Sequence, residues 1–136
     1  MSFFSKSSSG KPVILVVDDS PVVVLSIKTI LEPAGYEVLE ALDGAQGLNL
    51  AQKRRPQLIL LDMMMPGIDG VETLSRLKNN PATADIPVLM VTGSQTGKDV
   101  EKAFGYGATG YLVKPVESER LLNKIRATLS PQRPGS

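Results

Sequence analysis

The sequence of 136 residues contains neither cysteine nor histidine. Without cysteine, a disulfide framework and a thiolate zinc site are both excluded. The lack of histidine removes histidine general bases, Ser-His triads and imidazole metal ligands together. No segment approaches the roughly 20 apolar residues that a membrane-spanning helix requires, so we expect no membrane span.

Acidic and basic residues nearly balance, and the net charge is +1. A net charge this small does not indicate direct nucleic-acid binding or a polybasic patch that would bind a membrane surface. The opening residues MSFFSKSSSG are too polar to form a signal peptide, so we expect a cytoplasmic protein. The length suits one domain, which we place at residues 12–130, with a flexible tail at 1–11 and a tail or the start of a linker at 131–136.

Apolar runs and helical patterns alternate five times along the chain. The strand-like runs cover residues 13–17, 37–41, 57–62, 87–91 and 111–113. The helical patterns begin at Pro21 and after Asp43, and then cover about residues 69–79, 97–106 and 117–129. Such alternation with short connections predicts βαβ units and a parallel sheet with helices on both faces, which is an α/β fold.

Local signals also indicate where two helices begin and which side of one helix faces the core. Ser20 is a natural N-cap, and Asp43 is expected to cap the second helix. Ala45, Leu48 and Ala51 lie at helical spacing and are expected on the inner face of that second helix.

Polar side chains end four of the five predicted strands. Asp18 and Asp19 follow the first strand, Asp62 ends the third, Thr92 follows the fourth and Lys114 follows the fifth. Because parallel strands end at the same edge of a sheet, these side chains should lie together. Clustered carboxylates raise one another's pKa unless cations intervene. Lys114 supplies one positive charge, and an oxygen-only ligand set favours Mg²⁺ for the remainder.

With these residues the sequence resembles the receiver domain of two-component response regulators. The resemblance covers roughly residues 12–130 and rests on DDS after the first strand, LILLDMMMPGIDG at the third, VTG at the fourth and GATGYLVKP around the fifth. It implies a single doubly wound (βα)5 domain of the flavodoxin-like, CheY-like fold. The five parallel strands of this fold have the order 2-1-3-4-5.

The resemblance also implies roles for the acidic residues. Asp62 would be phosphorylated by a sensor histidine kinase, a phosphotransfer protein or a small acyl phosphate. Asp19 and Asp62 would ligate Mg²⁺, for which Mn²⁺ can substitute, and Asp18 would contribute through the metal's water shell. Met64 would provide its backbone carbonyl. A carboxylate nucleophile needs no general base, which agrees with a chain that lacks histidine.

The remaining roles concern the phosphoryl group and a switch. Thr92 would hydrogen-bond one phosphoryl oxygen, Lys114 would pair with another, and the bond before Pro115 is expected to be cis. Thr92 would move toward the phosphoryl group and Tyr111 would turn inward, which shifts the face of the fourth helix, fifth strand and fifth helix. That face would meet an unidentified downstream protein, an output domain or a second copy of the chain. Such a protein catalyses only its own phosphorylation and dephosphorylation, so we do not expect an enzyme with other substrates.

Two other classes share part of the pattern. Phosphatases of the haloacid dehalogenase type also use an Asp nucleophile, but they need a second Asp two residues later, where this chain has Met64. A flavodoxin-like FMN binder would need a phosphate loop rich in hydroxyls and glycine where DDSP stands, and aromatic residues are only 4% of the chain. The run from Met63 to Met65 is explained most simply by apolar packing.

Each site residue alone also has an ordinary structural explanation. Asp18 and Asp19 could cap the first helix, and the Thr92 hydroxyl could bond to local backbone. Lys114 alone would more often be solvated, and Tyr111 alone would more often be packing. Their joint occurrence at one predicted sheet edge favours the functional interpretation.

Overall fold

The computed structural model describes residues 10–130, so the two predicted tails lie almost entirely outside the described residues. Within this range five strands alternate with five helices. The strands are β1 (Val13–Val17), β2 (Glu37–Ala41), β3 (Leu58–Leu61), β4 (Val88–Thr92) and β5 (Gly110–Val113). The helices are α1 (Pro21–Leu31), α2 (Gly44–Arg54), α3 (Gly70–Lys78), α4 (Gly97–Gly105) and α5 (Ser118–Leu129).

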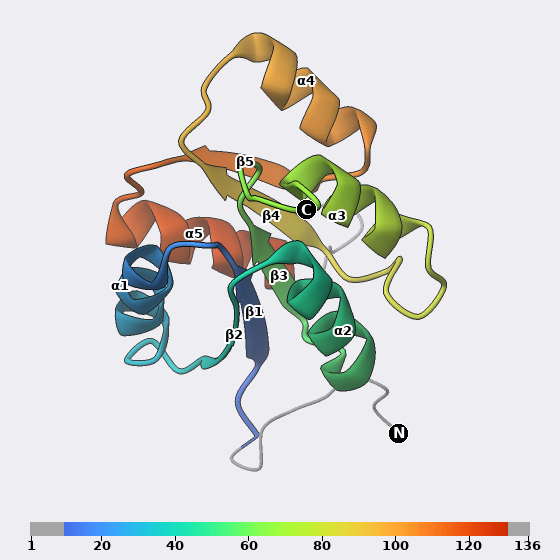
Figure 1. The fold of residues 1–136 in the computed structure, drawn as a ribbon. Helices are drawn as coiled ribbons and strands as arrows, with labels where there is room; N and C mark the ends of the chain where they lie inside the picture. Colours follow the sequence, from blue (N-terminus) through green and yellow to red (C-terminus); the bar gives the residue numbers. More distant parts are fainter. Residues whose placement is uncertain (1–9, 131–136) are drawn as a thin grey trace, which may run out of the picture.

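The strands form one parallel sheet in the order β2-β1-β3-β4-β5. Helices α1 and α5 cover one face of the sheet, and α2, α3 and α4 cover the other (Figure 1). The buried residues therefore form two hydrophobic cores, one on each face of the sheet. The doubly wound α/β fold expected from the alternation of elements is confirmed.

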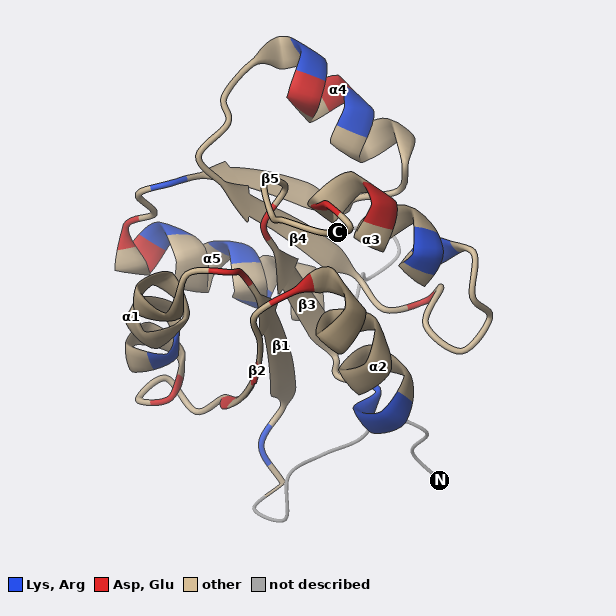
Figure 2. Cartoon of the chain, in the orientation of Figure 1, with Lys and Arg blue, Asp and Glu red and all other residues tan. Residues whose placement is uncertain are grey.

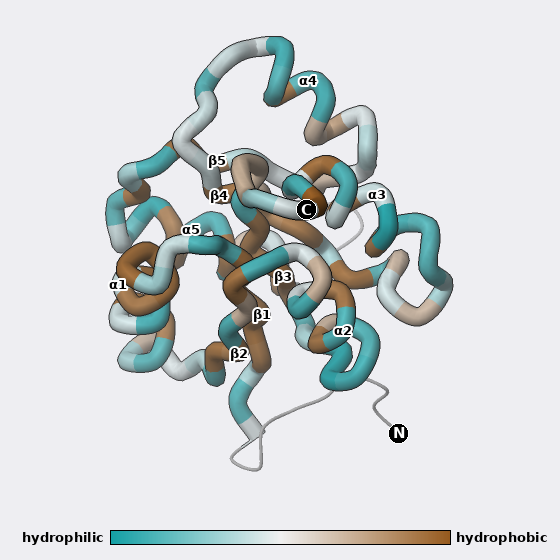
Figure 3. Tube along the Cα trace, viewed as in Figure 1, coloured by the Kyte–Doolittle hydropathy of each residue, from teal (hydrophilic) through white to brown (hydrophobic). Residues whose placement is uncertain are grey.

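Burial along the strands explains their composition. Every residue of β1, β3 and β4 is buried, because these strands lie inside the sheet and have helices on both faces. The edge strand β2 mixes buried and exposed positions, which allows the two glutamates in its sequence EVLEA. In Figure 3 the central strands are accordingly drawn mostly in the hydrophobic colour.

Three strands differ by one residue from their predicted ranges: the third and fourth at both ends, and the fifth at its start, which is Gly110. The third strand ends at Leu61, so Asp62 lies just beyond it, although its backbone N–H still donates to the carbonyl of Val17 at 3.0 Å. The fourth strand begins at Val88 and includes Thr92. Pro87 has no N–H to donate to the ladder and stands before the strand, where its carbonyl accepts from Ile59.

The predicted inner face of the second helix was wrong at one position. Ala45 is exposed, and α2 instead buries Gly44, Gly47 and Ala51. A Cβ on Gly47 would lie 2.9 Å from the side chain of Val17. The helix therefore approaches β1 so closely that glycine, rather than a larger apolar residue, faces the sheet.

Several helices begin as the sequence predicts. The side chains of Ser20 and Asp43 accept hydrogen bonds from the first turns of α1 and α2. Asp69 and Thr96 cap α3 and α4 in the same way. Among residues 10–130, none of these helices is long and apolar enough to cross a membrane.

Candidate functional site

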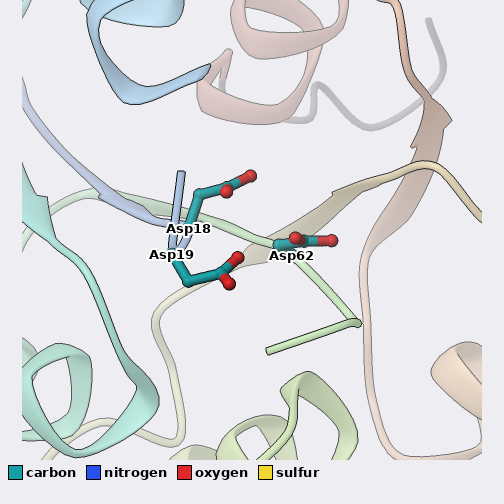
Figure 4. A group of neighbouring side chains, drawn as sticks. All are labelled: Asp18, Asp19 and Asp62. Atoms are coloured by element: carbon teal, nitrogen blue, oxygen red, sulfur yellow. The ribbon is translucent and has the colours of Figure 1, made fainter. Parts of the chain in front are cut away.

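Three carboxylates meet at the carboxyl edge of the sheet. Asp18, Asp19 and Asp62 place one carboxylate oxygen each within 4.8 Å of the others. Figure 4 shows the three side chains next to one another, two from the end of β1 and one from the end of β3. The pairing of Val17 with Leu61 explains this proximity, because Asp18 and Asp62 each follow one member of that pair.

The backbone holds two of these carboxylates in place. The N–H of Asp18 donates to the carbonyl of Ala41 at 3.0 Å, which extends the ladder beyond the strand. Each carboxylate then accepts from the N–H two residues on, Asp18 from Ser20 at 2.9 Å and Asp62 from Met64 at 3.3 Å. Asp18 is 2% exposed and Asp62 is 6% exposed, whereas Asp19 reaches solvent.

A glycine that the sequence interpretation did not single out determines how closely α3 approaches this edge. The N–H of Gly70 donates to the carbonyl of Met63 at 2.9 Å. A Cβ on Gly70 would lie 2.2 Å from the backbone oxygen of Asp62 and 2.5 Å from Cα of Met63. Only glycine fits this contact. A glycine in the first turn of a helix, directly after its N-cap, was the available signal.

Lys114 provides the cation expected at the site. Its Nζ lies 2.5 Å from Asp18 Oδ2 and 3.4 Å from Asp62 Oδ2. The backbone N–H of Lys114 donates to the carbonyl of Thr92 at 2.8 Å, which fixes the end of β5 beside the end of β4. The peptide bond between Lys114 and Pro115 is cis.

The site remains negative overall, because one ammonium faces three carboxylates. Acidic residues are drawn in red in Figure 2, where they mark the connection between β1 and α1. An oxygen-only donor set with excess negative charge fits a hard divalent cation. Asp18, Asp19 and Asp62 are the residues that could hold it.

Thr92 is fully buried, and its hydroxyl has no hydrogen-bond partner among residues 10–130. A buried polar group without a partner is costly, and native structures contain few of them. The next residue, Gly93, has open space where a Cβ would stand. The unpaired hydroxyl and the open space beside it fit a ligand group with oxygen atoms.

Tyr111, in β5, is half-buried and contacts the segments that follow β3 and β4. Its hydroxyl donates to the backbone carbonyl of Ser94 at 2.8 Å, and the same oxygen is 4.0 Å from Sδ of Met63. Burial raises the pKa of the Tyr111 phenol, and the negative charges of Asp99 and Asp62 raise it further. The acceptor residue, Ser94, was not singled out from the sequence, because a backbone carbonyl gives no signal in a sequence.

The three methionines after Asp62 differ in exposure. Met63 and Met65 are buried in the core between the sheet and α2, α3 and α4. Met64 is 66% exposed, and its N–H is already directed to the Asp62 carboxylate. The buried pair therefore acts as apolar packing, while the backbone of Met64 borders the acidic site.

An open parallel sheet with carboxylates, a lysine and a buried hydroxyl at its carboxyl edge defines a class of small α/β proteins with the flavodoxin-like, CheY-like fold. Comparison with known proteins identifies the family. The family model described as "Response regulator receiver domain" matches residues 14–126, so the chain belongs to that family.

Relatives agree with this assignment. The chain is 39% identical to Protein PilH from Pseudomonas aeruginosa, over 86% of this chain and 97% of PilH. It is 43% identical to the DNA-binding dual master transcriptional regulator RpaA from Synechocystis, over 87% of this chain and 49% of RpaA. It therefore spans nearly all of PilH but about half the length of RpaA.

Among solved structures, the chemotaxis protein CheY4 from Vibrio cholerae superposes with a TM-score of 0.83 at 34% identity, over 88% of this chain and 99% of CheY4. The chain is thus a receiver domain of the two-component response regulator family. Receiver domains interact with histidine kinases and with output domains, and they serve as signalling phosphoacceptors rather than as conventional enzymes.

Proposed function

We propose that Asp62 accepts a phosphoryl group from a sensor histidine kinase, a phosphotransfer protein or a small acyl phosphate. The observation that carries this proposal is the setting of Asp62, which is almost buried between the Lys114 ammonium and two further carboxylates. The unpaired hydroxyl of buried Thr92 at the adjacent strand end supplies a donor for a phosphoryl oxygen.

The transfer itself requires positioning and charge neutralisation more than covalent assistance. A carboxylate oxygen of Asp62 forms the new P–O bond as the P–N bond of a phosphohistidine, or the P–O bond of an acyl phosphate, breaks. Lys114 pairs with one phosphoryl oxygen, and Thr92 donates its hydroxyl to another. Asp19, Asp62 and the backbone carbonyl of Met64 would hold Mg²⁺, with Asp18 contributing through the metal's water shell. The ion would supply further positive charge, and Mn²⁺ could replace it.

The proposed output is a shift of the face formed by α4, β5 and α5. Thr92 and Tyr111 connect this face to Asp62, because the Tyr111 hydroxyl contacts Ser94, two residues after Thr92. Exposed charged residues of α5, among them Glu119, Arg120 and Lys124, are available to a downstream protein, an output domain or a second copy of the chain. The phosphorylated state favours this face through contacts that only that state makes.

Acetyl phosphate tests the proposal directly. We expect the chain to gain one phosphoryl group when it is incubated with acetyl phosphate and Mg²⁺, as measured by intact-protein mass spectrometry. The adduct should be lost on brief treatment with base, because an acyl phosphate hydrolyses easily. A matched incubation with excess EDTA should give no adduct. An adduct that forms equally well with EDTA, or none under any condition, would contradict the proposal.

Mg²⁺ alone should stabilise the fold. At a hundred times its dissociation constant, an ion that binds only the folded state adds about 2.7 kcal/mol to the free energy of unfolding. Asp19→Asn should remove most of this gain, because it replaces one of the three clustered carboxylates with a neutral amide. Urea titrations with and without Mg²⁺ measure the difference. Asp43→Asn is the matched control, since asparagine caps α2 as well as aspartate does, and it should respond like the unaltered chain.

A further inference from the structure

The connection between β4 and α4 contains a residue that makes two different contacts. Ser94 accepts the Tyr111 hydroxyl on its backbone carbonyl at 2.8 Å. Its own hydroxyl donates to the carboxylate of Asp99, in the first turn of α4. Ser94 therefore contacts both Tyr111, the proposed switch residue, and α4, which belongs to the face that the proposed switch shifts.

Few other contacts hold the Ser94 carbonyl in this position. Gly93 begins the connection and Gly97 is the first residue of α4 after it, and a Cβ at either would meet open space. Helix α4 is held to the core mainly through Ala103. A segment with this backbone freedom and this little packing does not fix a carbonyl by itself.

Hydrogen bonds to Asp99 supply the missing restraint. The backbone N–H of Asp99 donates to Oγ1 of Thr96, the N-cap of α4, at 3.2 Å. Its carboxylate reaches back to the Ser94 hydroxyl, so the connection is tied at both of these points to the first helical turn. A hydrogen bond to an ionised carboxylate is roughly twice as strong as one between neutral groups.

We propose that Asp99 is a positioning residue of the switch, because it holds Ser94 where the Ser94 carbonyl can receive the hydroxyl of Tyr111. This inference rests on the proposed phosphoacceptor function and goes beyond it, since Asp99 has no role in that proposal. Without Asp99 the carbonyl moves, and the half-buried hydroxyl of Tyr111 loses its acceptor. The position of Tyr111 in which its hydroxyl donates to the Ser94 carbonyl then becomes less populated.

The rate of phosphorylation by acetyl phosphate with Mg²⁺ is the first readout. Asp99→Ala should lower the initial rate by roughly fivefold, because a smaller fraction of the chain has the competent arrangement. Asp99→Asn keeps an oxygen that accepts from Ser94 and should restore most of the rate. Glu101→Ala removes an exposed acidic residue from the same helix and should leave the rate unchanged.

A double-mutant cycle separates positioning from general loosening of α4. If Asp99 acts through the Tyr111 hydroxyl, Asp99→Ala should have no further effect in a chain that already carries Tyr111→Phe. Ser94→Ala, which keeps the carbonyl but removes its restraint, should behave like Asp99→Ala. Additive losses in the double variant, or equal losses in Asp99→Asn and Asp99→Ala, would overturn the inference.

The state of the tyrosine in the unphosphorylated chain gives an independent readout. NMR of tyrosine ring carbons should show the Tyr111 signal shifted toward that of an exposed tyrosine in Asp99→Ala, and unshifted in Glu101→Ala. If the unaltered chain takes up no phosphoryl group, the proposed function fails, and the Tyr111 signal still decides the positioning role. An unchanged Tyr111 signal in Asp99→Ala would refute that role even if phosphorylation proceeds.

Discussion

Replacing Asp62 with asparagine is expected to abolish the phosphoryl adduct. Asparagine has nearly the same shape, but its amide oxygen is neutral and is not a competent nucleophile. The carboxylates of Asp18 and Asp19 lie within 4.8 Å of Asp62. We expect no transfer to Asp18, because its carboxylate is engaged by Lys114 and by the N–H of Ser20, and none to Asp19, because its proposed role is to bind Mg²⁺. Mass spectrometry after incubation with acetyl phosphate and Mg²⁺ should therefore show the unmodified chain alone.

The same substitution should leave the fold intact. Asp62→Asn removes one of three clustered negative charges while Lys114 keeps its contact of 2.5 Å with Asp18. The substitution removes both the repulsion from the two other carboxylates and the ion pair with Lys114, so the free energy of unfolding should change little. Asp85→Asn is the control, because Asp85 lies before β4, at the opposite edge of the sheet, and pairs with Arg55. An adduct of unchanged yield in Asp62→Asn would assign the acceptor to another residue.

Gly70→Ala is expected to give the largest loss of stability among single substitutions near the site. The new Cβ would lie 2.2 Å from the backbone oxygen of Asp62, and a backbone atom cannot rotate out of the way as a flexible side chain can. Either the start of α3 or the end of β3 must shift. We expect a loss of about 3 kcal/mol and a fall in Tm of roughly 10 °C or more. Phosphorylation should slow as well, because the shift displaces Asp62.

Gly105→Ala isolates the clash from helix propensity. Both glycines lie in helices and have negative φ, so alanine improves the propensity at either position. At Gly105 the added Cβ meets no atom within 4 Å. This variant should therefore be as stable as the unaltered chain or more stable by about 0.5–1 kcal/mol. Thermal and urea unfolding of the two variants measure the contrast, and equal stabilities would show that α3 adjusts without cost.

Most of the fold could be predicted because its signals are local. The apolar runs of β1 and β3, the caps at Ser20 and Asp43, and the turn residues between elements each depend on a few neighbouring residues. Local signals also identified the ends of the strands, and therefore which side chains share the carboxyl edge of a parallel sheet. The acidic cluster and Lys114 were found in this way.

The closest packing contacts could not be predicted, because they depend on the distance between elements that are far apart in the sequence. The exposure of Ala45 and the burial of Gly47 follow from how near α2 lies to β1. Hydropathy does not report that distance, so periodicity placed alanine on the inner face. Gly70 is a similar case, since its requirement for glycine appears only when α3 meets the end of β3.

The sequence by itself determined the α/β fold class and the set of acidic, hydroxyl and lysine side chains at one edge of the sheet. It did so because side-chain chemistry and strand ends are properties of short segments. Tertiary structure alone decided that Lys114 contacts Asp18 more closely than Asp62, that the Thr92 hydroxyl is buried without a partner, and that Ser94 is held between Tyr111 and Asp99. These are distances of a few ångströms between separate elements, and only the packing of helices on the sheet sets them.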